Sequence, residues 1–411
     1  LGPTLASWLE ESLPATYRRI RDAERLRFAR QGAGGGLAQP YHHTILPLAS
    51  RREKELQVAW GIADFEHRFG RRPRGMWLPE TAADTETLEV LADHGIELTL
   101  LAPWQADTER LDPFRPARIE LPSGRSVAAF FYHGGLSGRL SFDPGVSVNA
   151  DSFVQHHLAP LREVAQGDGL VLVATDGELY GHHQKDRQHF LRHLLGKAAP
   201  GAGLEVTSLE AYLDGHPAAR RIGLREPSSW SCHHGVRRWA GDCPCTRQTG
   251  WKAPLRRVFQ VLAEELDEVY QELAAELVGD ADALLERSVE LQLGTIKLAA
   301  LAEEVRGEAL VPANLHRLRL VLESQWLRHR MFPSRARFHG ELERLDVRNN
   351  LSAALVALGL AERAVGRPLA AWLPAILERI KNPFTGRSAA SVAAEAHWVR
   401  EGNGRAWRQA S

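Results

Sequence analysis

Two carboxylates directly follow apolar segments that are typical of buried strands. Glu80 follows Gly-Met-Trp-Leu-Pro at residues 75–79, and Asp176 comes two residues after Leu-Val-Leu-Val-Ala at residues 170–174. Two carboxyl groups about 5–5.5 Å apart can cleave a glycosidic bond, one attacking the anomeric carbon and the other protonating the leaving oxygen. Glu80 and Asp176 are therefore candidates for this chemistry. The alternatives are a helix cap, an ion-pair partner or, for Asp176 before Gly177, a turn residue.

Other polar residues next to Asp176 compete for roles at the same place. Glu178 could donate the proton if the loop turned differently, but we favour a hydrogen-bonding role for it within the loop or in support of the catalytic residues. His182 could orient a carboxylate or bind a sugar hydroxyl. The alternative for His182 is a capping or surface histidine.

The three cysteines of the chain form a third constellation. Cys232, Cys243 and Cys245 lie near His233 and His234, and together they contain enough soft ligands for a tetrahedral zinc ion. The Cys-x-Cys spacing is tighter than the Cys-x2-Cys spacing of most zinc sites. We therefore favour a packed loop with free thiols, and we predict no metal and no cofactor.

The composition of the chain limits which binding partners and which cellular location are expected. The chain has 411 residues, with 51 basic and 51 acidic side chains, so its formal net charge is zero. This balance argues against nucleic acid or an anionic membrane as a partner and is compatible with a neutral polysaccharide. No apolar run approaches the roughly 20 residues of a membrane span. An odd, small number of cysteines and the lack of a signal pattern predict a cytoplasmic protein.

Alternating helical and strand-like segments should position the two carboxylates. Near-continuous apolar strands alternating with helices predict a parallel sheet or barrel, in which ligands bind at the carboxyl ends of the strands. Strand signals nearly vanish after about residue 251, so we predict domains at residues 1–229 and 230–411, the second all-helical. Strands are expected at 75–79, 96–101, 127–132 and 170–174, and helices at 51–68, 84–94, 152–164, 186–195, 255–277, 281–304, 313–328, 349–365 and 370–381.

Three motifs carry a resemblance to a known family. Residues 77–80 (Trp-Leu-Pro-Glu) resemble the nucleophile motif of glycoside hydrolase family 57, and residues 176–182 resemble its acid/base motif. Residues 43–48 (His-Thr-Ile-Leu-Pro-Leu) resemble a third motif whose histidine lines the sugar site. The order and spacing of the three motifs agree with the family. Residues 330–334 and 349–354 resemble parts of a C-terminal domain of unknown function found in one branch.

The resemblance implies a fold and a reaction. The fold would be α/β, an incomplete (β/α)7 barrel followed by a helical domain that closes over the cleft. The substrate would be an α-glucan polysaccharide or maltooligosaccharide, cleaved with retention of configuration. Glu80 would form the glycosyl-enzyme intermediate and Asp176 would act as acid/base. The substrate-binding residues implied or inferred at matching positions are His43, Trp77, Glu178, His182, Trp230 and Trp239.

The sequence also departs from the family, and this leaves two alternatives open. The first family motif, a His-x-His-x-Gln-Pro-like strand, is not found, so the sequence is expected to begin after the first barrel strand. One alternative is a zinc-dependent deacetylase- or mannosidase-like barrel, with ligands from His42–His43, Asp176 and His182–His183. The other is a non-catalytic glucan-binding protein.

Overall fold

The structure is a computed structural model that describes residues 1–395. The chain forms two compact units, each assembled from separate stretches of sequence. Unit 1 contains Leu1–Trp8, Gln39–Arg72 and the chain from Ser231 onward, and unit 2 contains Leu9–Ala38 and Pro73–Trp230. The chain thus passes from one unit to the other at residue 230, close to the predicted boundary. Residues 39–72, however, group with the C-terminal helices, and the division into domains 1–229 and 230–411 stays a prediction.

Unit 2 contains a mixed six-stranded sheet in the order β1-β2-β5-β4-β6-β3. The half that contains β1, β2 and β5 is parallel, since β1 pairs with β2 and β2 with β5 in parallel registers. On the other side β4 pairs antiparallel with β5 and parallel with β6, while β3 pairs antiparallel with β6. The strands are β1 (Gly75–Met76), β2 (Leu98–Leu101), β3 (Ala106–Asp107), β4 (Ala117–Glu120), β5 (Ser126–Phe131) and β6 (Arg220–Leu224).

The apolar segment at residues 170–174 corrects one expectation, because it is extended but is not assigned as a strand. The Leu170 N–H donates to the Phe114 carbonyl and the His133 N–H donates to the Leu172 carbonyl, at 2.9 and 2.8 Å. Its side chains alternate between two cores, because successive residues of an extended chain face opposite ways. Leu170 and Leu172 pack against Leu98 and Phe130, whereas Val171 and Val173 pack against a helical cluster. Partial burial on both faces, without a full hydrogen-bond ladder, accounts for the apolar run.

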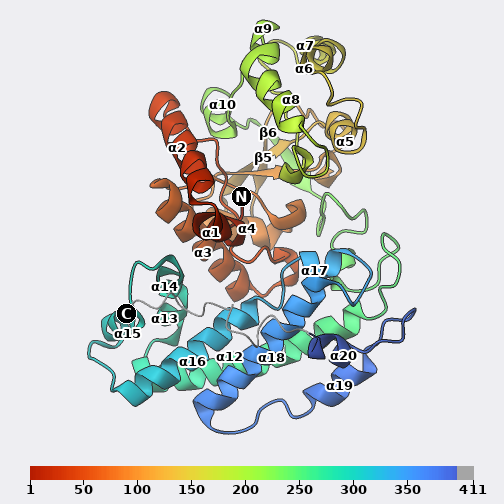
Figure 1. Cartoon of the computed structure of the whole chain (residues 1–411). Coiled ribbons are helices and arrows are strands. Elements are labelled where there is room, and N and C mark those ends of the chain that lie inside the picture. Colours follow the sequence, from red (N-terminus) through yellow and green to blue (C-terminus); the bar gives the residue numbers. More distant parts are fainter. Residues whose placement is uncertain (396–411) are drawn as a thin grey trace. The chain divides into compact units, whose positions relative to one another are not determined.

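The helices of unit 2 lie beside the sheet and around that second core. Figure 1 shows α5 to α9 gathered together, and their shared core contains Leu136, Phe153, Phe190 and Leu194. A π-helical turn joins α6 to α7, and another joins α8 to α9, which makes the predicted helix at 152–164 continuous. The helices are α2 (Pro14–Gln31), α4 (Thr85–Asp93), α5 (Gly134–Phe142), α6 (Ala150–Phe153), α7 (Ala159–Val164), α8 (Arg187–His193), α9 (Ala199–Gly201) and α10 (Leu209–Gly215).

Unit 1 is helical throughout its described residues, apart from short irregular segments. The long helices α12, α16 and α18 lie side by side (Figure 1) and share one large apolar core. Helix α3 belongs to the same core, because Trp60 stacks on Trp326 with ring centroids 4.4 Å apart. The helices are α3 (Arg51–Phe69), α11 (Arg237–Ala240), α12 (Lys252–Val278), α13 (Ala281–Arg287), α14 (Val289–Leu293), α15 (Leu298–Arg306), α16 (Pro312–His329), α17 (Arg335–Phe338), α18 (Leu345–Val365), α19 (Leu373–Arg379) and α20 (Ala389–Ala394). Helix α1 (Pro3–Ser12) contributes to both units.

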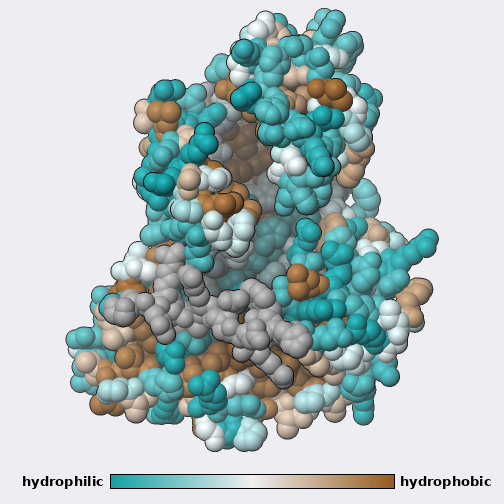
Figure 2. Space-filling view, viewed as in Figure 1, coloured by the Kyte–Doolittle hydropathy of each residue, from teal (hydrophilic) through white to brown (hydrophobic). Residues whose placement is uncertain are grey.

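The face of the molecule drawn in Figure 2 is mostly polar. Figure 2 shows hydrophilic residues over most of the visible face, with small hydrophobic groups between them. Among residues 1–395, no helix combines the length and apolar character needed to cross a lipid bilayer.

Candidate active site

The loop after β1 holds Glu80 in an unusual backbone conformation. Glu80 and the next residue, Thr81, have φ angles of 58° and 49°, in the left-handed region. Each non-glycine residue in this region costs on the order of 1–3 kcal/mol, so the surrounding structure must hold the loop in place. Strained residues of this kind concentrate at functional sites.

Gln105 is one residue that holds this loop. Its side chain is fully buried and makes four hydrogen bonds. Oε1 accepts from the Ala102 N–H and the Thr81 hydroxyl, at 2.8 and 2.7 Å. Nε2 donates to the Thr81 carbonyl and the Ser228 hydroxyl, at 2.8 and 3.0 Å. The Gln105 amide therefore connects the Glu80 loop to the chain around residue 228, which is far from both in the sequence.

The segment ending at Trp230 completes the support. Ala83 and Ser228 form an antiparallel bridge with reciprocal backbone hydrogen bonds. The Trp230 backbone N–H then donates to the Glu80 carbonyl at 3.0 Å, and its indole Nε1–H donates to Glu80 Oε2 at 2.8 Å. A donor on a carboxylate oxygen stabilises the ionised form, which is the form that a nucleophile requires.

Further aromatic rings pack around the Trp230 indole that binds this carboxylate. Trp77 and Tyr132 contact the Trp230 ring edge to face, with centroids 5.1 and 6.2 Å apart. Trp104 contacts Tyr132 and donates its indole N–H to the Ser229 carbonyl at 3.0 Å. Burial raises the pKa of Tyr132, which therefore stays a neutral phenol. Tyr132 and Trp104 were not predicted as site residues, although Tyr132 directly follows β5 and so lies at a strand end, where ligands are expected to bind.

The Asp176 loop is built differently. Asp176, Glu178 and His182 are all exposed. Asp176 precedes a short 3-10 turn without a side-chain capping bond, and its carbonyl accepts the Leu179 N–H at 3.2 Å. The Glu178 carbonyl accepts the backbone N–H groups of His182 and His183. Glu178 and His182 are thus neighbours of Asp176 in one exposed loop.

Both loops belong to the same side of the parallel strands. Tyr132, at the end of β5, contacts Trp230 and so lies beside Glu80. The next residue, His133, donates to the Leu172 carbonyl. Four residues of chain reach at most about 14 Å, so Asp176 lies within that distance of Leu172. This arrangement agrees with the expected use of strand carboxyl ends, while the catalytic roles of Glu80 and Asp176 stay predictions.

His43, from the third motif, lies in unit 1 and is also held tightly. Its φ is 56°, its Nδ1 lies 2.8 Å from the Ser334 hydroxyl, and its carbonyl accepts the Ser334 N–H at 3.0 Å. Burial, reinforced by the charge of Arg335, lowers the pKa of His43 to about 4, so the ring is neutral near pH 7. His42 is buried, and its Nδ1 lies 3.2 Å from Gln57 Nε2, at one edge of an aromatic cluster.

Trp239 does not share the setting of Trp230. It lies in unit 1, is 1% exposed and packs against Phe338 with ring centroids 6.3 Å apart. This burial favours a packing role over the predicted stacking on substrate.

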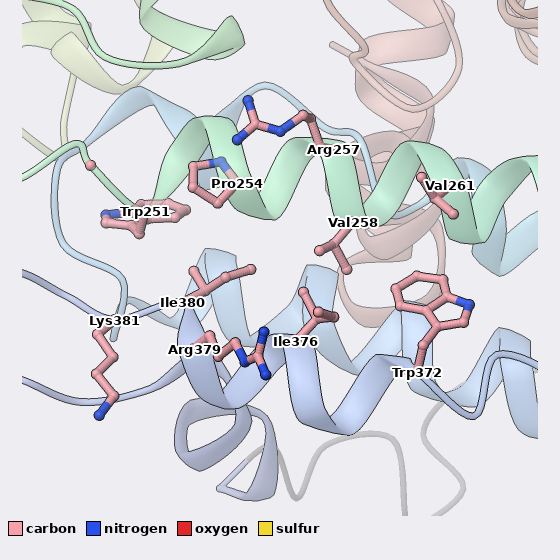
Figure 3. A pocket seen from close by; sticks show the side chains of 11 residues that line it. Trp251, Pro254, Arg257, Val258, Val261, Trp372, Ile376, Arg379, Ile380 and Lys381 are labelled. Carbon is pink, nitrogen blue, oxygen red and sulfur yellow. The ribbon is translucent and has the colours of Figure 1, made fainter.

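The two described cavities do not contain the acidic motifs. One, of about 580 Å³, lies between α12 and α19 (Figure 3), and its walls include Trp251, Trp372 and the basic residues Arg257, Arg379 and Lys381. The other, of about 470 Å³, lies at the amino ends of β2 and β5. The first has no carboxylate in its lining, and the second lies at the opposite end of the strands from Glu80. Neither is suited to glycosidic cleavage by this pair.

Residues 4–223 match the sequence model of glycosyl hydrolase family 57, and residues 248–388 match a domain of unknown function, DUF3536. The first match spans more than half of the chain. The chain belongs to glycoside hydrolase family 57. The resemblance found in the three motifs, and that of the C-terminal segment to a domain of unknown function, are confirmed.

Curated relatives of this family 57 chain are distant in sequence. A probable 1,4-alpha-glucan branching enzyme of Mycobacterium tuberculosis is 24% identical over 265 residues, which cover 51% of this chain and 47% of that protein. Alpha-amylase 1 of Dictyoglomus thermophilum is 29% identical over 98 residues, or 24% of this chain and 13% of that protein. The chain therefore spans about half the length of the branching enzymes it matches.

Solved structures share the fold. An exo-type maltose-forming amylase from Pyrococcus sp. ST04 has a TM-score of 0.74 at 16% identity, over 96% of this chain and 75% of that one. A family 57 branching enzyme from Thermococcus kodakaraensis has a TM-score of 0.57 at 16% identity, over 92% and 78%. The predicted fold class, an incomplete (β/α)7 barrel followed by an all-helical domain, is confirmed by these neighbours and by the mixed sheet of unit 2.

Proposed function

We propose that this family 57 chain is a retaining enzyme that cleaves α-1,4-glucans through a covalent glycosyl-enzyme intermediate. The observation that carries the proposal is the Glu80 loop. Its carboxylate lies in the loop that follows β1, in a left-handed backbone conformation, with an indole donor 2.8 Å from Oε2 and two further aromatic rings packed against that indole. An anion held ready in this way is suited to attack an electrophilic carbon.

The reaction has two steps. In the first, a Glu80 oxygen bonds to the anomeric carbon as the glycosidic C–O bond breaks, and Asp176 donates its proton to the leaving oxygen. In the second, Asp176, now ionised, takes a proton from water or a sugar hydroxyl, whose oxygen displaces Glu80 from the anomeric carbon. Two inversions give net retention. The proposal requires the two carboxyl groups to lie about 5–5.5 Å apart when substrate is bound.

The substrate class is inferred from the relatives. Their names describe a branching enzyme, amylases and a 4-alpha-glucanotransferase, all of which act on α-glucans. The half-buried rings of Trp77 and Trp230 provide flat apolar surfaces against which sugar rings pack, and the buried Tyr132 supports the Trp230 ring. Glu178 and His182 would supply hydrogen bonds to the substrate. Hydrolysis and transfer share the intermediate and differ in whether water or a sugar hydroxyl accepts the glycosyl group.

Trapping the intermediate is the direct test. A fluorinated glucosyl donor forms the intermediate but slows its breakdown, and peptide mass spectrometry then locates the sugar. We expect the label on the peptide that contains Glu80. A label on another carboxylate would reassign the nucleophile, and binding of maltooligosaccharide without any label would favour the non-catalytic alternative.

Product analysis with amylose then assigns the reaction. Short maltooligosaccharides indicate hydrolysis, redistributed chain lengths indicate transfer, and new α-1,6 linkages indicate branching. The zinc-dependent alternative has less support: among residues 1–395, Asp176 belongs to no group of three or more potential metal ligands within reach of one another. If activity required added metal and no glycosyl-enzyme formed, this alternative would replace the proposal.

A further inference from the structure

All three cysteines of the chain meet one histidine at a single point in unit 1. The Sγ atoms of Cys232, Cys243 and Cys245 and a ring nitrogen of His234 all lie within 4.8 Å of one another. Cys232 Sγ lies 3.6 Å from Cys243 Sγ and 3.9 Å from Cys245 Sγ. These separations far exceed the roughly 2.05 Å of a disulfide, and the cysteines are free thiols. His234 Nδ1 lies 3.3 Å from Cys245 Sγ and 3.5 Å from Cys243 Sγ.

Four of the six ligand-to-ligand distances are close to the edges of a zinc coordination tetrahedron, and the other two are at most 4.8 Å. With Zn–S bonds of about 2.3 Å and Zn–N bonds of 2.0–2.1 Å, a regular tetrahedron has S–S edges of about 3.8 Å and S–N edges of about 3.5–3.6 Å. The two measured S–S distances lie on either side of the first value, and the two measured S–N distances differ from the second by at most about 0.3 Å. Thiols that merely share an apolar core have no reason to adopt four such separations at once.

Local structure presents the ligands as two pairs. Cys232 and His234 are separated by one residue, as are Cys243 and Cys245, and each pair lies on a turn. The His234 carbonyl accepts the Arg237 N–H, and Gly235, with a φ of 75°, allows the chain to reverse there. The Thr246 N–H donates to the Cys243 carbonyl at 3.1 Å. The tight Cys-x-Cys spacing argued against a metal site, but a chain that turns at both pairs can bring all four ligand atoms together.

We propose that Cys232, His234, Cys243 and Cys245 bind one zinc ion in a closed structural site. Three thiolates select a soft or borderline metal over magnesium or calcium. Four protein ligands complete the tetrahedron and leave no position for a reactive water, so the ion stabilises the fold and takes no part in chemistry. Binding releases the thiol protons to solvent. The resulting site carries one net negative charge, which the guanidinium of Arg238, a hydrogen-bond partner of Cys245, can balance.

The position of the site in the chain indicates which segment the ion would stabilise. Cys232 follows Trp230 by two residues, and the cluster falls between the family match that ends at residue 223 and the one that begins at 248. Helix α11 lies between the two ligand pairs in the sequence. The buried Lys252 holds it in place, because its Nζ donates to the Arg238 carbonyl at 3.2 Å. The ion would fasten the segment that leaves Trp230. A consequence for activity rests on the proposed function, whereas metal binding itself does not.

Metal analysis of the purified full chain tests the site. We expect inductively coupled plasma mass spectrometry to find about one zinc ion per chain, as for a closed tetrahedral site. The variants Cys243→Ser and His234→Ala should lose most of this zinc, whereas the neighbouring His233→Ala should keep it. Wild-type protein without zinc above background, or Cys243→Ser with undiminished zinc, would overturn the proposal.

A second measurement uses the unaltered chain and so does not depend on how the variants fold. The three thiols should react slowly with a thiol reagent as purified and fast after treatment with a strong zinc chelator. Refilling the chelated protein with Co²⁺ should produce thiolate charge-transfer absorption and the strong visible bands of tetrahedral cobalt. Equal thiol reactivity before and after chelation, or a disulfide between two of the cysteines, would contradict the site. Neither readout involves turnover, so a chain that binds zinc but fails the trapping test would disprove only the proposed function.

Discussion

The Glu80 loop and the Asp176 loop both follow extended apolar chain in unit 2, yet they are held in opposite ways. The Glu80 loop has two left-handed residues, a buried amide that makes four hydrogen bonds, and an indole donor on the carboxylate. The Asp176 loop has an exposed carboxylate without a capping bond, and the segment before it is not assigned as a strand. The Glu80 carboxylate is thus held in place before substrate binds, whereas the Asp176 carboxylate is accessible to solvent.

The difference matches the two proposed roles. A nucleophile must meet one carbon atom along one line of approach, so misplacement is costly. An acid/base must exchange its proton with solvent or an acceptor between the two steps, which exposure permits. His43 in unit 1 resembles Glu80 in this respect, since it too has a left-handed backbone and is held by a residue far along the chain, Ser334.

The strongest test of the fixed loop is Glu80→Gln. The substitution keeps an oxygen for the Trp230 indole to bind but removes the nucleophile, so kcat should fall on the order of 10⁴-fold or more. Thermal stability should stay close to that of the wild type. The control is Glu120→Gln, an exposed carboxylate paired with Arg221, which should keep full activity. Turnover that survives in Glu80→Gln would remove the nucleophile assignment.

The exposed loop is tested by Asp176→Ala. Loss of general acid/base catalysis should lower kcat by about 10²- to 10⁴-fold. Because Asp176 is exposed and makes no capping bond, the melting temperature should not change. Azide, a small anion that needs no activation by a base, should restore turnover as glycosyl azide. The matched variant is Glu178→Gln, and a larger loss there than in Asp176→Ala would move the proton donor to Glu178.

The pH dependence of the free energy of unfolding tests how His43 is held. His43 has a pKa of about 4 in the folded protein and about 6.5 when unfolded, so the unfolded chain takes up the proton first as pH falls. The neutral ring contributes stability above pH 6.5, and this contribution is lost as pH falls from about 6.5 to 4. It amounts to roughly 3 kcal/mol. His43→Asn, which tolerates the left-handed backbone and does not titrate, should show a shallower loss of unfolding free energy over that range. An unchanged slope would contradict the depressed pKa.

The indole donor is isolated by Trp230→Phe. The change keeps an aromatic ring for Trp77 and Tyr132 but removes the hydrogen bond to Glu80 Oε2. A hydrogen bond to a charged group contributes about 1.5–3 kcal/mol, so kcat should fall by roughly 10- to 100-fold. The exposed Trp8 provides the control as Trp8→Phe, which should be silent. A wild-type rate in Trp230→Phe would show that the donor does not assist catalysis.

The smallest expected effects compare the supports of the two loops. Gln105→Leu leaves several buried partners unpaired and should lower the free energy of unfolding by about 2 kcal/mol or more, with reduced kcat. Tyr180→Phe removes the acceptor of the Thr175 hydroxyl, 3.1 Å away in the Asp176 loop, and should cost at most about 1 kcal/mol. Chemical denaturation measures both. Equal effects would mean that the two loops are supported alike.

The sequence by itself determined the types of the main elements and the positions of the two carboxylates along the chain. Apolar periodicity predicted the helices now seen as α3, α4, α12, α16 and α18, because that pattern reflects which face of each element is buried. The same local signal predicted a strand at residues 170–174. It missed that the side chains pack, partly buried, against two separate cores rather than between two neighbouring strands.

Only the tertiary structure decided which atoms hold the site. Gln105 and Trp230 lie 25 and 150 residues from Glu80, and the pairing of His43 with Ser334 spans 291 residues. Tertiary structure also decided the arrangement of the four proposed zinc ligands, although they are close in sequence. Their spacing looked unfavourable for a metal, but two turns bring the ligand atoms within 4.8 Å of one another. Local patterns record burial and backbone preference, whereas a hydrogen bond or a coordination tetrahedron depends on where distant segments meet, which no local pattern encodes.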